Sequence, residues 1–214
     1  GMVGADLENL INEAAILAAR RNKKIIERPE FEESIERVIA GPERKSRLIN
    51  PREKRIIAYH EAGHAVVINA LPEGDPVQKV SIISRGMMGG FTRALPTEDL
   101  SLESRKKLFA NMVSMLGGRA AEEIMFDDIT SGASSDIERV TKLARSMVTR
   151  LGMSEKLGPM VYGQKEEMVF LGREISEQRD YSEAVAQEID REVQSAVSEA
   201  YKTAKEILEK YKDK

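Results

Sequence analysis

The sequence has 214 residues, with 33 basic and 36 acidic side chains, a net charge of -3, no cysteine and two histidines. Without cysteine the chain can form neither disulfides nor thiolate metal sites, so any metal must be held by nitrogen and oxygen. The two signs of charge are mixed along the chain, which argues against a nucleic-acid partner, and no apolar run approaches the roughly 20 residues of a membrane span, so we expect a soluble chain.

The first part of the chain predicts a pair of helices. Apolar residues recur at helical spacing over 5–22 and lead into a basic run suited to a helix C-terminus. Pro29 then opens a second helix, which Gly41 and Pro42 end. Residues 43–49 are polar and basic without a period, which indicates a linker and a domain boundary near residue 46.

The longer second part predicts helices around a small sheet. Asn50 and Pro51 are typical of a helix start, and this helix should run to about Leu71. Two short strands are expected over 77–84 and 91–94. Further helices are expected over 102–116, 119–126 and 136–151 and from Tyr181 onwards, with strand-like pieces at 160–162 and 169–171. The predicted fold is mainly α with a small β-sheet (α+β).

The five residues from His60 to His64 contain both histidines of the chain, in the pattern His-Glu-x-x-His. On a helix, a spacing of four places both imidazoles on one face, where they can bind one zinc ion. Glu61 lies beside the pair, where a carboxylate can take a proton from water without binding the metal. A chance occurrence on an amphipathic helix is the alternative, but it does not explain why all the histidines share one window. The motif therefore predicts a zinc-dependent peptidase.

The third metal ligand is not fixed by the motif. Where one known class continues with a glycine and a third histidine, this chain has Val67 and Ala70, and no acidic residue lies between Asp75 and Glu98 to serve as the glutamate of a second class. Several carboxylates further along the chain remain candidates: Glu98, Asp99, Glu103, Glu122, Glu123, Asp127, Asp128, Asp136 and others farther towards the C-terminus. Asp136 stands where a loop of small residues meets a helix start, so it could equally be a capping residue. Glu122 and Glu123 could orient a ligand histidine or simply form a solvated helix face.

Three segments resemble the peptidase domain of FtsH-type AAA+ zinc metalloproteases: residues 55–66, residues 116–124 and the run Thr130–Asp136. Residues 4–10 resemble the last helices of the same family's ATPase module. The resemblance implies that residues 1–46 are the C-terminal helices of an AAA+ lid subdomain and residues 47–214 a zinc peptidase domain. It also implies that Asp136 is the third ligand of one zinc per chain, with His60 and His64, and that Glu122 supports a ligand histidine.

The resemblance further implies an ATP-dependent, processive quality-control protease, with Glu61 as general base of an EC 3.4.24 type metalloendopeptidase. Family members are homo-hexamers at the cytoplasmic face of a membrane and degrade unfolded or membrane proteins. The present sequence has no phosphate-binding loop, so ATP would act only through an ATPase module that this sequence lacks. Two alternatives remain: a non-catalytic oligomerisation or interaction module with a structural metal, or a lid fragment that serves a partner ATPase.

Overall fold

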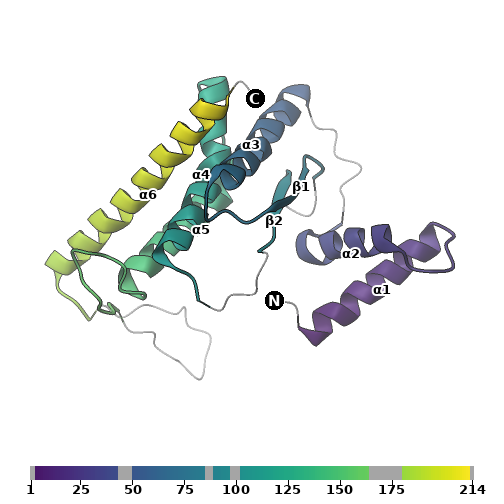
Figure 1. Ribbon diagram of the computed structural model, residues 1–214, viewed down its shortest axis with the longest axis horizontal. Helices are drawn as coiled ribbons and strands as arrows, with labels where there is room; N and C mark the ends of the chain where they lie inside the picture. Colours follow the sequence, from purple (N-terminus) through teal and green to yellow (C-terminus); the bar gives the residue numbers. More distant parts are fainter. Residues whose placement is uncertain (1–2, 43–49, 85–88, 97–101, 164–179, 213–214) are drawn as a thin grey trace. The chain divides into compact units, whose positions relative to one another are not determined.

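The computed structural model describes residues 3–42, 50–84, 89–96, 102–163 and 180–212, and it is mainly helical with one small sheet (Figure 1). The chain divides into two compact units, residues 1–58 with 81–91 and residues 59–80 with 92–214. The predicted fold class is confirmed. Within the described part of the chain, no helix is both long and apolar enough to cross a bilayer.

The first unit contains the predicted helical pair, α1 (Gly4–Arg20) and α2 (Arg28–Ala40). The two helices pack together, and α1 buries Leu10, Ala14 and Leu17. Pro29 lies in the first turn of α2, where its missing N–H costs nothing, and Gly41 ends the helix with φ of 84°. The predicted linker over 43–49, and with it the boundary near residue 46, lies outside the described residues.

The second unit is built around α4 (Arg105–Phe126), which packs against both α5 (Ser134–Thr149) and α6 (Glu183–Tyr211). A short 3-10 helix, η1 (Ser131–Ala133), leads directly into α5. The core is a cluster of buried aliphatic side chains from these helices and from α3 (Pro51–Ala70), including Val67, Met112, Val113, Val140 and Ile189. Asn50 caps α3 as expected, because its side chain accepts a hydrogen bond from Arg52 N–H at 2.9 Å.

Over the residues that the structure describes, the sheet has two strands, β1 (Val77–Ser81) and β2 (Phe91–Ala94). Leu95 N–H donates to Pro76 O at 3.2 Å, so the end of β2 lies beside the start of β1 and the strands run antiparallel. The first strand is shorter than predicted. The piece at 160–162 is not a strand, because glycines with positive φ at 158 and 163 turn the backbone on either side of it. The piece at 169–171 lies outside the described residues.

One prediction about the helices is wrong. Gly117 and Gly118 do not separate two helices but lie inside the continuous helix α4. A Cβ atom at Gly117 would lie 2.8 Å from the main-chain oxygen of Gly63, and one at Gly63 would lie 2.6 Å from Ala121 Cβ. The glycines are therefore present because α3 and α4 cross with their backbones in contact, which leaves no room for a side chain.

Candidate metal centre

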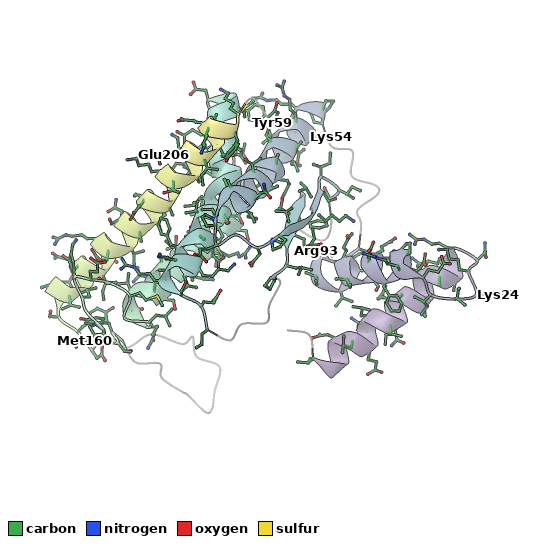
Figure 2. All side chains as sticks on the ribbon, viewed as in Figure 1. Lys24, Lys54, Tyr59, Arg93, Met160 and Glu206 are labelled. Atoms are coloured by element: carbon green, nitrogen blue, oxygen red, sulfur yellow. The ribbon has the colours of Figure 1, made fainter. Side chains whose placement is uncertain are left out.

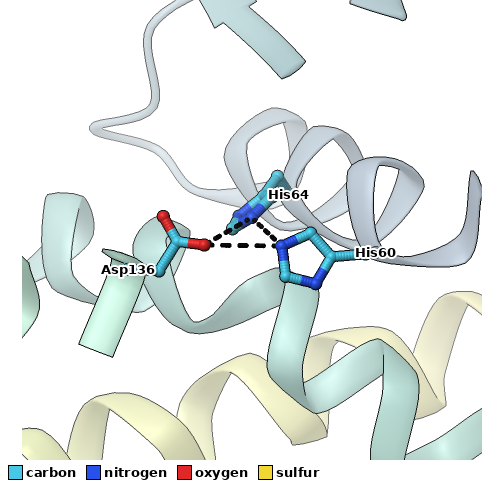
Figure 3. A group of neighbouring side chains, drawn as sticks. All are labelled: His60, His64 and Asp136. Atoms are coloured by element: carbon cyan, nitrogen blue, oxygen red, sulfur yellow. Dashed lines mark hydrogen bonds and ion pairs between the residues drawn. The ribbon is translucent and has the colours of Figure 1, made fainter. Parts of the chain in front are cut away.

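Helix α3 carries both histidines one turn apart, and the two rings lie edge to face, with their planes at 78° (Figure 3). The two Nε2 atoms are 3.1 Å apart, and the His60 side chain is buried. The spacing of four residues in a helix produces this arrangement directly, as the sequence predicts.

Asp136 comes to the same point from a different helix. It is the third residue of α5, and Ala133 rather than Asp136 occupies the N-cap position. Its Oδ2 atom is 3.4 Å from Nε2 of His60 and 3.4 Å from Nε2 of His64. Three ligands of a tetrahedral zinc ion, with bonds of about 2.0–2.2 Å, lie roughly 3.3–3.6 Å from one another. The two edges that meet at Asp136 have this length, and the Nε2–Nε2 edge of 3.1 Å is slightly shorter, so the triangle is close to the size that a zinc ion requires.

The outer hydrogen bonds of the histidines determine where their protons are. Nδ1 of His64 lies 2.7 Å from Ser114 O, and Nδ1 of His60 lies 2.7 Å from Oε1 of Glu122. A carbonyl and a carboxylate oxygen only accept hydrogen bonds, so each Nδ1 must carry the proton. In the neutral imidazoles each Nε2 then presents a lone pair to the centre of the triangle.

Three electron-pair donors thus converge within 3.4 Å of one another with no proton required between them. Lone pairs at this separation repel unless a positive charge lies among them, and a divalent cation supplies it. The two imidazoles and one carboxylate are a donor set that suits zinc. Together with the size of the triangle, this chemistry fits a zinc ion.

The pKa shifts of His60, Asp136 and Glu122 also indicate that the centre of the cluster favours a positive charge. Burial lowers the pKa of His60, but hydrogen bonds to Asp136 and Glu122 outweigh it and raise the value to about 9. For Asp136, burial raises the pKa, and the bonds to both histidines outweigh that effect and lower it. Glu122 follows the same pattern, because His60 and the Thr130 N–H stabilise its charged form. A cation at the centre would replace the proton that the carboxylates otherwise draw to His60.

Glu61 lies beside this triangle with only 7% of its surface exposed. Burial raises the pKa of its carboxyl group, against the opposing effects of a hydrogen bond from Thr92 and of the two histidines. The Thr92 hydroxyl, from β2, is 2.8 Å from Oε2 of Glu61. A buried carboxyl with a raised pKa is the type of group that takes and returns protons near neutral pH.

The structure shows different contacts for Glu122 and Glu123, which the sequence alone does not distinguish. Glu122 is buried, and besides His60 it accepts a hydrogen bond from Thr130 N–H at 2.7 Å. It thus joins α3 to the loop that leads to Asp136. Glu123 faces α6, where it binds Tyr201 and Lys205.

The remaining carboxylate candidates lie elsewhere. Asp127 is the left-handed C-cap residue of α4, Asp128 binds its neighbour Ile129 N–H, and Glu103 contacts Asn111. Glu98 and Asp99 lie outside the described residues. Sequence reasoning missed the contacts of Thr92, Ser114 and Thr130, because each depends on a tertiary neighbour that no local pattern reveals.

Comparison with known proteins gives a consistent result over the whole chain. Residues 47–214 match the model of peptidase family M41, and residues 1–33 match that of the AAA+ lid domain. The ATP-dependent zinc metalloprotease FtsH 1 of Thermomicrobium roseum is 60% identical over 214 residues, which are 100% of this chain and 33% of that protein. The ATP-dependent zinc metalloprotease FtsH of Thermotoga maritima is 59% identical over 213 residues, which are 99% of this chain and 35% of that protein.

The chain therefore spans about a third of the length of the curated relatives that it matches. The family match covers more than three quarters of the chain, including every residue of the candidate metal centre. The chain belongs to peptidase family M41, the family of these ATP-dependent zinc metalloproteases.

Proposed function

We propose that this chain is the peptidase part of an ATP-dependent zinc metalloprotease and that it holds one zinc ion through His60, His64 and Asp136. The observation that carries the proposal is the convergence of two imidazole nitrogens and one carboxylate oxygen, with both Nδ1–H groups already bonded elsewhere. Such a site has the three protein ligands of a catalytic zinc, which leaves a fourth position for water or substrate.

The chain's own residues supply the proton transfers. When bound, zinc would polarise the scissile carbonyl and make water more acidic. Glu61 accepts the proton of the attacking water and passes it to the nitrogen of the leaving amine. Glu122 holds the His60 ring and its tautomer through Nδ1–H, as carboxylates beside metal-binding histidines commonly do. The reaction is hydrolysis of an internal peptide bond.

We infer that the substrate is an extended polypeptide that pairs with an edge of the sheet. Both strands are candidates, and β2 is the better placed, because its Thr92 side chain contacts Glu61. Pairing through main-chain hydrogen bonds needs little sequence specificity and suits unfolded or membrane protein substrates. In β1 the three central residues are exposed, which argues against an ordinary core sheet.

The assembly is also proposed by analogy with the relatives. We infer that residues 1–46 are the end of an AAA+ lid and residues 47–214 the peptidase domain, within a homo-hexamer at the cytoplasmic face of a membrane. ATP would act through the ATPase module of the longer protein, because unfolding and threading of a folded substrate require a motor. Unfolded casein is therefore the appropriate substrate for the chain itself.

The test combines zinc content by elemental analysis with casein hydrolysis, on the parent chain and on three variants. Asp136→Ala should lose zinc and activity together, because two histidines alone bind zinc much more weakly. Glu61→Gln should keep zinc and lose turnover. Asp128→Ala, which removes an exposed carboxylate from the loop before η1, is the matched control and should behave like the parent chain.

The other outcomes point elsewhere. Unchanged zinc and activity in Asp136→Ala would move the third ligand to another carboxylate such as Glu122. Activity retained in Glu61→Gln would remove Glu61 from the mechanism. Stoichiometric zinc without hydrolysis of any unfolded substrate would favour an interaction module with a structural metal, and no zinc in the parent chain would contradict the proposal as a whole.

A further inference from the structure

The Thr92 hydroxyl bridges two oxygens of a single residue. Its Oγ1 atom is 2.8 Å from the carboxylate Oε2 of Glu61 and 2.9 Å from the main-chain oxygen of Glu61. The carboxylate and the main-chain carbonyl of Glu61 both lie near the Thr92 hydroxyl, so the Glu61 side chain must fold back towards the helix backbone. This contact restricts the rotamers of Glu61. The restraint comes from outside α3, since Thr92 belongs to β2.

We propose that Thr92 is a positioning residue, which holds the Glu61 carboxylate beside the metal centre and links it to the strand that pairs with substrate. The inference rests on the proposed function of Glu61 as general base. A general base on a flexible stem of two methylene groups is less effective when its carboxylate samples orientations in which it cannot reach the water. The hydroxyl fixes one oxygen of that carboxylate and leaves the other for proton transfer.

The number of donors and acceptors at Thr92 explains why a hydroxyl suits this position. Thr92 has one proton to donate and two oxygens within reach, so it bonds to one of them at a time. While Glu61 is charged, the proton of Thr92 is drawn to the carboxylate, because charged acceptors form the stronger bond. The proton from water goes to the other oxygen, Oε1, so Thr92 can keep its hydrogen bond to Oε2 during the transfer. The Glu61 carboxyl group therefore keeps its position before and after the proton transfer.

The position of Thr92 in the sheet adds a second restraint. Side chains alternate between the faces of a strand, so the Thr92 side chain faces α3 while its backbone remains part of β2. A substrate that adds to the edge of β2 is then bound by the same strand that holds the base. Thr92 would then connect the bound substrate backbone to Glu61 through a single residue.

The test compares three variants of the full chain with the parent in zinc content, kcat and KM for a fluorogenic peptide. Thr92→Val keeps the shape and removes the hydroxyl, and it should lower kcat roughly ten- to a hundredfold, with KM and zinc content nearly unchanged. Thr92→Ser restores the hydroxyl and should recover most of the rate. Thr203→Val removes a threonine hydroxyl that donates to Glu199 O within α6, and it should match the parent.

A second measurement tests the contact without catalysis. Melting temperatures of Thr92→Val, Glu61→Ala and the double variant form a cycle, and the effect of losing the hydroxyl should be larger when the carboxylate is present. Additive effects would overturn the inference. So would full activity in Thr92→Val, loss of zinc in that variant, or failure of Thr92→Ser to restore the rate. If the parent chain itself hydrolyses nothing, the proposed function fails, and the cycle still decides whether Thr92 holds Glu61.

Discussion

Glu122 and Glu123 are neighbours in the sequence with opposite surroundings, because successive side chains on a helix point about 100° apart. Glu122 lies under His60, whereas Glu123 joins α4 to α6 through Lys205 at 2.7 Å and through the Tyr201 hydroxyl. Burial and the Glu123 charge raise the pKa of Tyr201 to about 12, so its hydroxyl keeps its proton and donates. Glu122 therefore supports the metal centre, whereas Glu123 supports the packing of α4 against α6.

Replacing Glu122 by alanine should weaken zinc binding by about 10- to 100-fold, because His60 loses the acceptor that fixes its ring and tautomer. The Thr130 N–H also loses its partner, which loosens the loop before Asp136. Zinc affinity is measured by competition with a chromogenic chelator.

Glu123→Ala is the matched control for this prediction. It should bind zinc like the parent chain and unfold at a lower temperature, because only the contacts with Tyr201 and Lys205 are lost. Equal zinc affinity in Glu122→Ala and Glu123→Ala would show that Glu122 does not support the metal centre.

At the scale of elements, the crossing of α3 and α4 depends on residues without side chains. A methyl group at Gly118 would overlap the His60 ring, and one at Gly117 would press on the backbone of Gly63. A glycine pair in a sequence is an ordinary signal for the end of a helix, so the local pattern gives the wrong prediction here. The tertiary requirement for close backbones outweighs the helix propensity of glycine, which costs about 1 kcal/mol per residue.

Gly118→Ala should displace the His60 ring and remove most of the bound zinc, although alanine is the better helix former. Overpacking of this kind also costs about 1–3 kcal/mol of stability. Gly4→Ala is the control, since a Cβ there meets no atom within 4 Å. Zinc content and circular dichroism measure the two effects, and a Gly118→Ala chain with full zinc would contradict the crossing geometry.

In the helical pair, an ion cluster around one buried carboxylate joins the end of α1 to α2. The Glu30 carboxylate is fully buried and accepts bonds from Arg21 at 2.6 Å and from Lys23 at 3.0 Å. The Arg21 and Lys23 bonds hold the pKa of Glu30 down to about 2. A carboxyl whose pKa is lower in the folded chain adds stability above its unfolded pKa, near 4.5, and loses that contribution as the pH falls towards 2.

Glu30→Gln should therefore lower the melting temperature at pH 7, and the difference from the parent chain should shrink as the pH falls from 4.5 towards 2. Glu32→Gln, in an exposed pair with Arg28, should show little difference at any pH. Thermal unfolding over the pH range measures both. A Glu30→Gln difference that stays constant with pH would mean that the carboxylate charge does not stabilise the pair.

At the scale of the molecule, the sequence predicts features that depend on neighbouring residues, and it does not predict contacts between residues far apart in the chain. The histidine pair follows from a spacing of four on one helix, and most helices follow from periodicity and caps. By spacing, Asp136 is one of many candidate carboxylates, since its approach to His60 depends on how α5 packs against α4. Only the resemblance to a known family singled it out. The Thr92 contact had no signal in the sequence, because a strand residue reaches its helix partner only in the folded chain.

Removal of zinc should lower the melting temperature of the unit that contains the site. The proposed ligands come from α3 and α5, so zinc would join these two helices. A ligand present at a hundredfold its Kd stabilises the folded state by about 2.7 kcal/mol, and for a unit of this size that is roughly 5–10 °C in melting temperature. We expect a shift of this size when zinc is added back to a chelator-treated chain.

The variants separate metal binding from catalysis in the same experiment. Glu61→Gln should show the full zinc-dependent shift without activity, because Glu61 is not a ligand. Asp136→Ala should show little shift, because one helix no longer contributes. An equal shift in Asp136→Ala and the parent chain would mean that zinc does not join α3 to α5, and the converging lone pairs of the structure would then need another source of positive charge.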